Sequence, residues 1–323
     1  MLHGWGIRPY DWQFGVSIQH ELLPRVSVDV GYNRRWWGNH FFTDNRAVGP
    51  QDFDTATITA PSNTNLPNGG GYPVTFVTRN ARSPLGATDN YYTFASDYGD
   101  VTTYWHGVDV SVNARTSNGF TFQGGTGTGR GVRDYCQMTD ALPELFVTVG
   151  SVLANAQESA CAVDESWLTT FRSSVTYTIP RIDVLVAGSI RSTPNTQPST
   201  INTFVATNGG SVAANYNVTS QILQGSSIGR PLAPGMAFQT VDLTLPGEVY
   251  PDRINSVDMR VAKVLRFHGY RMDVGFDFYN LFNANTGTAF NQVYDVVSNG
   301  ASWLRPTSVL NPRFARFNFT LNF

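Results

Sequence analysis

The sequence predicts an all-β fold, an antiparallel transmembrane β-barrel that is here a partial barrel of about nine strands with long extracellular loops. Three observations predict it. First, apolar and polar side chains alternate with a period of two in about nine segments, and only strands have that period. Second, short turns and long loops follow one another in strict alternation. Third, only 14% of the residues are charged while 13% are aromatic. That composition suits membrane barrels and also large secreted β-proteins.

The predicted strands are each long enough to cross a bilayer at the usual tilt. In the last of them, Phe317, Phe319 and Leu321 share one face, while Arg316 and Asn318 share the other. The strands are expected at residues 10–22, 25–37, 103–115, 119–130, 167–179, 182–192, 255–267, 270–282 and 315–323.

The connections between these strands separate the barrel from other β-folds. Tight turns are expected at 23–24, 117–119, 180–181 and 268–269, and long loops at 38–102, 131–166, 193–254 and 283–311. Short turns on one rim and long loops on the other are typical of bacterial outer-membrane barrels. A propeller would instead show a fixed repeat of about 40–50 residues, which the chain lacks.

The charges favour a hydrated lumen on one side of the sheet and lipid on the other. Asp and Arg recur on the polar side of most predicted strands, and a dry protein core could not hold them without a large desolvation cost. Lys263 and His20 depart from the pattern, because both fall on the apolar side. Both lie near the tight-turn rim, where a long side chain can reach water. A β-bulge at 262–263 is the alternative explanation.

Composition excludes several other classes of protein. The net charge is −2 and no basic patch is present, which argues against a nucleic-acid partner. No apolar run is long enough for a membrane-spanning helix. Residues 1–12 do not have the pattern of a signal peptide, so we expect either a cytoplasmic chain or a missing beginning.

An odd number of strands does not close an antiparallel ring. We therefore expect residues 1–323 to be the C-terminal part of one outer-membrane β-barrel domain, with the plug and N-terminal regions absent from this chain.

Three stretches, at 25–39, 259–286 and 303–323, resemble the C-terminal barrel of TonB-dependent outer-membrane receptors of the Oar-like type, which often carry a carboxypeptidase-regulatory-like domain at the N-terminus. The YNLFN block at 279–283 is similar to the family's penultimate-strand motif. Phe323 matches the family's outer-membrane assembly signal.

The resemblance implies a fragment of a receptor and transporter in the bacterial cell outer membrane, whose barrel wall and loops capture a specific cargo. The cargo would be an oligosaccharide, a peptide or a metal chelate. Outer-membrane lipid and the barrel-assembly machinery are the other implied partners. The TonB complex would act through regions without a counterpart here. Two alternatives stay open: a passive porin or structural and adhesive barrel, and a soluble secreted β-protein that binds carbohydrate.

Aromatic residues gather at the loop ends of several predicted strands. They form either an interfacial girdle or a stacking platform for cargo. The candidates for cargo contact are Trp36, Trp37, Tyr91, Tyr92, Tyr104 and Trp105.

Cys136 and Cys161 are the two cysteines, and they lie in one polar, turn-rich loop. In an oxidising compartment we expect a disulfide that closes this loop and contributes about 3 kcal/mol. The alternative is two free thiols.

No catalytic or cofactor pattern stands out. The five His are scattered without the spacing of a zinc site. The glycines of GGTGTGRG at 124–131 fall on the lumen side, which favours a smooth wall over a phosphate loop. Acidic residues in the first long loop form either a calcium site or a set of solvated carboxylates: Asp52, Asp54, Asp97 and Asp100. We expect no enzymatic activity and no cofactor.

Overall fold

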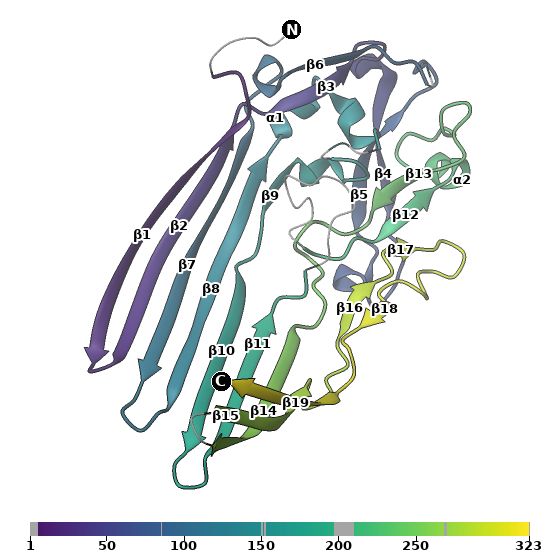
Figure 1. Ribbon diagram of the computed structural model, residues 1–323. Helices are drawn as coiled ribbons and strands as arrows, with labels where there is room; N and C mark the ends of the chain where they lie inside the picture. Colours follow the sequence, from purple (N-terminus) through teal and green to yellow (C-terminus); the bar gives the residue numbers. More distant parts are fainter. Residues whose placement is uncertain are drawn as a thin grey trace.

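The computed structural model describes residues 6–84, 86–149, 151, 153–196, 210–267 and 270–322. All nine predicted segments are strands, and they form one curved antiparallel sheet in chain order (Figure 1). The strands are β1 (Tyr10–Leu23), β2 (Val26–Gly38), β7 (Thr102–Arg115), β8 (Thr121–Asp134), β10 (Leu168–Ile179), β11 (Val184–Thr193), β14 (Ile254–Phe267), β15 (Tyr270–Tyr279) and β19 (Phe314–Asn322). The all-β, antiparallel prediction is confirmed. No helix within the described ranges is long and apolar enough to cross a membrane.

Several strand boundaries differ from the prediction. The strand predicted at 119–130 spans Thr121–Asp134, so the start of the predicted loop at 131–166 is part of β8. At two other boundaries a left-handed residue ends the strand. Asp183 has φ 47°, so Ile182 and Asp183 belong to the turn before β11 rather than to the strand. β15 ends at Tyr279 because Asn280 has φ 49°. The side chain of Asn280 holds this turn by donating to the carbonyls of Ala284 and Asn311, each at 2.8 Å. The turn predicted at 268–269 and the assembly signal at Phe323 lie outside the described residues.

The apolar side chains of all nine strands meet in register on one face of the sheet, which we call the apolar face. Ile18, Val30 and Val110 lie directly opposite one another across β1, β2 and β7. At the other end of the sheet, Val261, Phe276 and Phe317 do the same across β14, β15 and β19. Ile18 is 73% exposed and Phe317 is 61% exposed. This face is therefore not packed against a protein core.

The opposite side, the polar face, carries cross-strand polar and ionic pairs. Asp277 on β15 pairs with Arg316 at 2.9 Å and with Arg260 at 3.7 Å. Asn33 on β2 donates to Asp109 on β7 at 2.8 Å. These pairs join charged and polar side chains across neighbouring strands of the polar face.

The hydrophobic cores lie in the four long loops, for which no structure was predicted. These loops together form what we call the loop layer (Figure 1). Its helices are α1 (Cys136–Thr139) and α2 (Ser220–Gln224), accompanied by short 3-10 turns. Its strands are β3 (Phe41–Asn45), β4 (Phe53–Thr59), β5 (Pro73–Arg79), β6 (Asn90–Phe94), β9 (Ala162–Asp164), β12 (Asn215–Val218), β13 (Gln239–Asp242), β16 (Gly287–Phe290), β17 (Val293–Tyr294) and β18 (Pro306–Val309).

Two clusters of buried side chains hold the loop layer together. The first joins three loops, with Phe76, Val241 and Trp303 among its members. The second joins the first two loops, with Phe53 and Met138 among its members. Among the described residues, neither cluster includes a side chain from the nine long strands.

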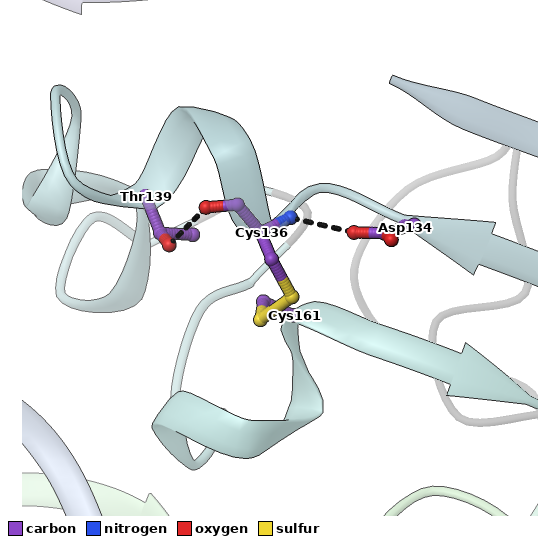
Figure 2. Close-up of a disulfide and its surroundings, with 4 residues drawn as sticks. All are labelled: Asp134, Cys136, Thr139 and Cys161. Carbon is purple, nitrogen blue, oxygen red and sulfur yellow. Dashed lines mark hydrogen bonds between the residues drawn. A yellow bond between two sulfur atoms is a disulfide. The ribbon is translucent and has the colours of Figure 1, made fainter. Parts of the chain in front are cut away.

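A disulfide joins Cys136 and Cys161 across the second loop (Figure 2). The Cys136 amide donates to Asp134 at 2.9 Å, and Thr139 Oγ1 donates to the Cys136 carbonyl at 2.8 Å. Cys161 is a member of the second cluster. The disulfide thus ties the end of β8 to the packed interior of the loop layer.

Asp242 is a buried acid at the centre of the loop layer. Its Oδ1 accepts hydrogen bonds from the Ala214 amide at 2.7 Å, the Thr244 amide at 3.0 Å and the Thr244 hydroxyl at 2.9 Å. Burial nevertheless raises the pKa of the Asp242 carboxyl to about 6. The folded state therefore binds the proton more tightly than the unfolded chain, whose Asp pKa is about 3.9.

We predict that Asp242 makes the loop layer less stable as the pH rises from about 4 through 6. Protonation of Asp242 stabilises the folded state fully at pH values below the pKa of Asp in the unfolded chain, and this stabilisation is lost above the pKa of Asp242 in the folded state. The free energy of unfolding changes by about 3 kcal/mol between these two limits. In Asp242→Asn the amide oxygen can accept the same three hydrogen bonds, and this dependence should disappear. Hydrogen-exchange protection of the β12 and β13 amides, compared between the two proteins from pH 4 to 7.5, measures it. The same pH dependence in both proteins would contradict the assignment.

Candidate functional site

A groove of about 640 Å³ opens at the loop-side ends of β1, β2, β7 and β8. Most of its side chains belong to the polar face, including Trp37 and Trp105. Asn33, Arg35 and Glu165 supply polar groups to the same groove.

Trp105 lies across a glycine pair that makes room for its ring. Gly107 on β7 and Gly129 on β8 are direct register partners. A Cβ added to either glycine would collide with the Trp105 indole. The predicted smooth stretch of wall is therefore present at Gly129, where the lack of a side chain leaves space for the Trp105 indole.

Arg35 is held beside Trp37 by an ion pair. Its Nε lies 2.7 Å from Asp11 Oδ2, and its guanidinium carbon lies 4.9 Å from the centre of the Trp37 ring. Gln13 also donates to Asp11, at 2.9 Å. These contacts fix a cation against an aromatic surface at one end of the groove.

Glu165 closes the other end of the groove. Its Oε2 accepts from the Gly131 amide at 3.3 Å. Burial raises the pKa of the Glu165 carboxyl, and the nearby Arg133 opposes that rise in pKa. The groove thus offers two indole surfaces flanked by donors and acceptors. That arrangement can bind a flat polar ligand.

The structure divides the six predicted cargo aromatics into three groups. Trp37 and Trp105 lie on the polar face and line the groove. Trp36 and Tyr104 lie directly opposite each other on the apolar face. Tyr91 and Tyr92 belong to β6 in the loop layer, where Tyr92 stacks on the Phe41 ring with centroids 5.1 Å apart. The sequence did not separate these groups, although the strand parity distinguishes 36 from 37 and 104 from 105.

Two arginines farther along the polar face oppose each other. Arg172 on β10 and Arg191 on β11 are direct register partners. Within the described part of the chain, neither forms an ion pair. Asp258 accepts from the Asn280 amide at 2.9 Å, and Asp273 pairs with Arg271 on its own strand at 3.2 Å.

Three of the four acids predicted in the first loop have protein partners for their carboxylates, and the fourth, Asp100, donates its backbone amide to Gln137 at 3.0 Å. Asp54 pairs with Arg230 at 2.7 Å, and Asp52 accepts from the Gly49 amide at 2.9 Å. Asp97 accepts from the Thr93 hydroxyl. Across the described ranges, no group of three or more His, Cys, Asp or Glu side chains is arranged to hold a metal ion. The calcium hypothesis therefore has no support.

Lys263 and His20, the two residues expected to break the apolar pattern of their strands, differ in their contacts. Lys263 Nζ donates to the Ile182 carbonyl in the tight turn, and the pairing through Ala262 and Lys263 shows no register shift. The β-bulge alternative is therefore wrong for Lys263. His20 lies opposite Val28 and is exposed.

Three basic residues on the apolar face were not predicted from the sequence, namely Arg34, His106 and Arg130. They share strand parity with Val30, Val108 and Thr126, so the signal was present. They lie near the loop-side ends of β2, β7 and β8.

No protein-family model and no curated protein matches the chain. Among solved structures, the chain is similar to the outer membrane transporter YddB from Escherichia coli, with 10% sequence identity and a TM-score of 0.46. The match covers 98% of this chain and 32% of that one, so this chain spans about a third of the length of that transporter.

We predict that Gly129→Ala destabilises the wall by about 1–3 kcal/mol, because the added methyl group would collide with the Trp105 indole. Gly31→Ala is the matched control, since its Cβ would meet Ser17 Cβ at an ordinary 3.6 Å. Thermal unfolding, followed by the change in gel mobility of the folded form, measures both variants. Equal stability of the two would show that the indole does not lie over Gly129.

Proposed function

We propose that this chain forms part of the wall and outer loops of a transporter barrel in the bacterial outer membrane, of the TonB-dependent, Oar-like type, with no enzymatic activity. One observation carries the proposal: the apolar side chains stay in register across nine strands, and the face that they form is exposed. Each large apolar side chain left in water forgoes about 1.5–3 kcal/mol. Acyl chains of outer-membrane lipid would cover this face.

The alternatives fit these observations less well. A soluble carbohydrate-binding protein would leave the apolar face in water, where patches of this extent mark an interaction surface. A passive porin would also have one apolar face and one polar face. However, the packed loop layer and the aromatic groove favour selective capture over free diffusion.

The proposed route begins at the loop layer and continues into the groove on the polar face. Trp37 and Trp105 would stack against flat or apolar parts of a cargo, while Arg35 and Glu165 would bind its polar groups. An oligosaccharide, a peptide and a metal chelate all carry groups of both kinds. Energy from the TonB complex and assembly by the barrel-assembly machinery, with Phe323 as its signal, are part of this proposal.

We predict opposite outcomes for the same charge placed on the two faces at one depth. Val30 lies on the apolar face opposite Val110, while the next residue, Ser111, lies on the polar face opposite Asp29. Val30→Arg should lose about 2–4 kcal/mol of stability in the membrane, whereas Ser111→Arg should be nearly neutral. The fraction of heat-modifiable protein recovered from outer membranes measures this difference. Equal recovery of both variants would contradict the proposed facing.

The groove gives a second prediction, which concerns cargo. Trp105→Ala should weaken binding of the cargo by about tenfold, because a contact with one aromatic ring contributes about 0.5–1.5 kcal/mol beyond the area that it buries. Trp36→Ala, on the apolar face, should leave binding unchanged. Titration with a linear oligosaccharide, an oligopeptide and a ferric chelate, using the membrane-integrated protein, provides the measurement. Equal losses in both variants, or no binding of any of the three probes, would count against capture in this groove.

A further inference from the structure

A row of basic side chains crosses the apolar face near its loop-side edge. Arg34 on β2, His106 on β7 and Arg130 on β8 are direct register partners, with Phe14 of β1 at the end of the row. We call Arg34, His106 and Arg130 the basic row.

Rows of different character lie on either side of the basic row. Two residues toward the loops, Trp12, Trp36 and Tyr104 lie opposite one another. Two residues toward the tight turns, Val16, Tyr32 and Val108 do the same. On β2 and β7 the basic row therefore lies between a row of aromatic side chains and a row of Val and Tyr side chains. In a barrel, such a change from aromatic to aliphatic side chains marks the boundary between headgroups and hydrocarbon.

Arg34 has aromatic neighbours but no acidic partner. Its guanidinium carbon lies 4.9 Å from the centre of the Tyr104 ring and 5.9 Å from that of Trp36. Within the part of the chain that the structure describes, no carboxylate pairs with it. Its side chain is exposed, so its donors are open to a ligand.

Arg130 is more strongly held than Arg34. Its Nε donates to His106 Nε2 at 3.1 Å, its Nη1 lies 2.8 Å from Asp164, and its guanidinium carbon lies 5.4 Å from the centre of the Trp167 ring. His106 also contacts Trp167, with ring centroids 5.0 Å apart. Asp164 thus pairs with Arg130, whereas Arg34 has no carboxylate partner among the described residues.

Arg253 continues the positive charge toward the next strands. Its guanidinium donates to the Thr169 carbonyl at 2.7 Å and to Ser192 Oγ at 3.2 Å. Ser192 lies opposite Phe171, on the apolar face.

We propose that the basic row binds the phosphate of an anionic lipid headgroup in the leaflet that surrounds the loop-side rim. This inference rests on the proposed function, because it requires the apolar face to meet lipid. An arginine that faces hydrocarbon without an anionic partner is costly. A phosphate removes that cost and accepts the forked donors of arginine. Arg34 and Arg130 lie two strands apart, about 10 Å, so flexible side chains can share one headgroup.

The test uses the membrane-integrated protein, stripped of lipid in an uncharged detergent. Diphosphorylated lipid A, its dephosphorylated form and inorganic phosphate are the probes, and native mass spectrometry measures binding. The wild type should prefer the phosphorylated lipid. The double variant Arg34→Gln/Arg130→Gln should bind it about tenfold more weakly. Arg172→Gln/Arg191→Gln, which removes the same charge from the polar face, should bind like the wild type.

Three results would overturn the inference: unchanged binding in the first double variant, equal loss in both double variants, or displacement of the lipid by inorganic phosphate at equal phosphate concentration. Resistance of each protein to alkaline extraction from membranes is measured in parallel. Proteins that integrate but show no preference for phosphorylated lipid would refute this inference alone. Failure of the wild type to integrate would refute the proposed function.

Discussion

The register that keeps apolar side chains on one face of nine strands is the constraint on which the rest of the structure depends. A slip of one residue in any strand would carry its Val or Phe side chains to the polar face and its charges to the apolar one. The rows from Ile18 to Val110 and from Val261 to Phe317 show no such slip. The exposed apolar face, the ion pairs around Asp277 and the groove at Trp105 all follow from this register.

The loop layer obeys a different physical rule from the sheet below it. Its stability comes from buried clusters such as the one around Phe76 and Trp303, as in a small soluble domain. The wall instead leaves its largest apolar side chains exposed. The chain therefore combines a loop layer with its own hydrophobic core, as in a water-soluble domain, and a sheet whose apolar face requires apolar surroundings instead of water. The disulfide between Cys136 and Cys161 joins the end of β8 to that core.

The strands could be predicted from the sequence because a period of two is a local signal, visible within each segment. The loop layer could not, because its clusters join residues far apart in the chain, such as Phe76 and Trp303. The cargo aromatics were partly predictable: Trp37 and Trp105 follow from strand parity once the strands are fixed. The space that Gly107 and Gly129 leave for the Trp105 ring depends on the pairing of β7 with β8. The alternation of side chains within a single strand does not show which residues of two strands pair.

The central claim is that the apolar face meets hydrocarbon and the polar face meets water. Spin labels placed one at a time at residues 28–33 of β2 in the membrane-integrated protein test it directly, because oxygen concentrates in lipid and a charged nickel chelate stays in water. The account predicts that oxygen relaxes the labels at Val28, Val30 and Tyr32, whereas the chelate relaxes those at Asp29, Gly31 and Asn33. Uniform accessibility along this stretch, or the opposite alternation, would contradict it.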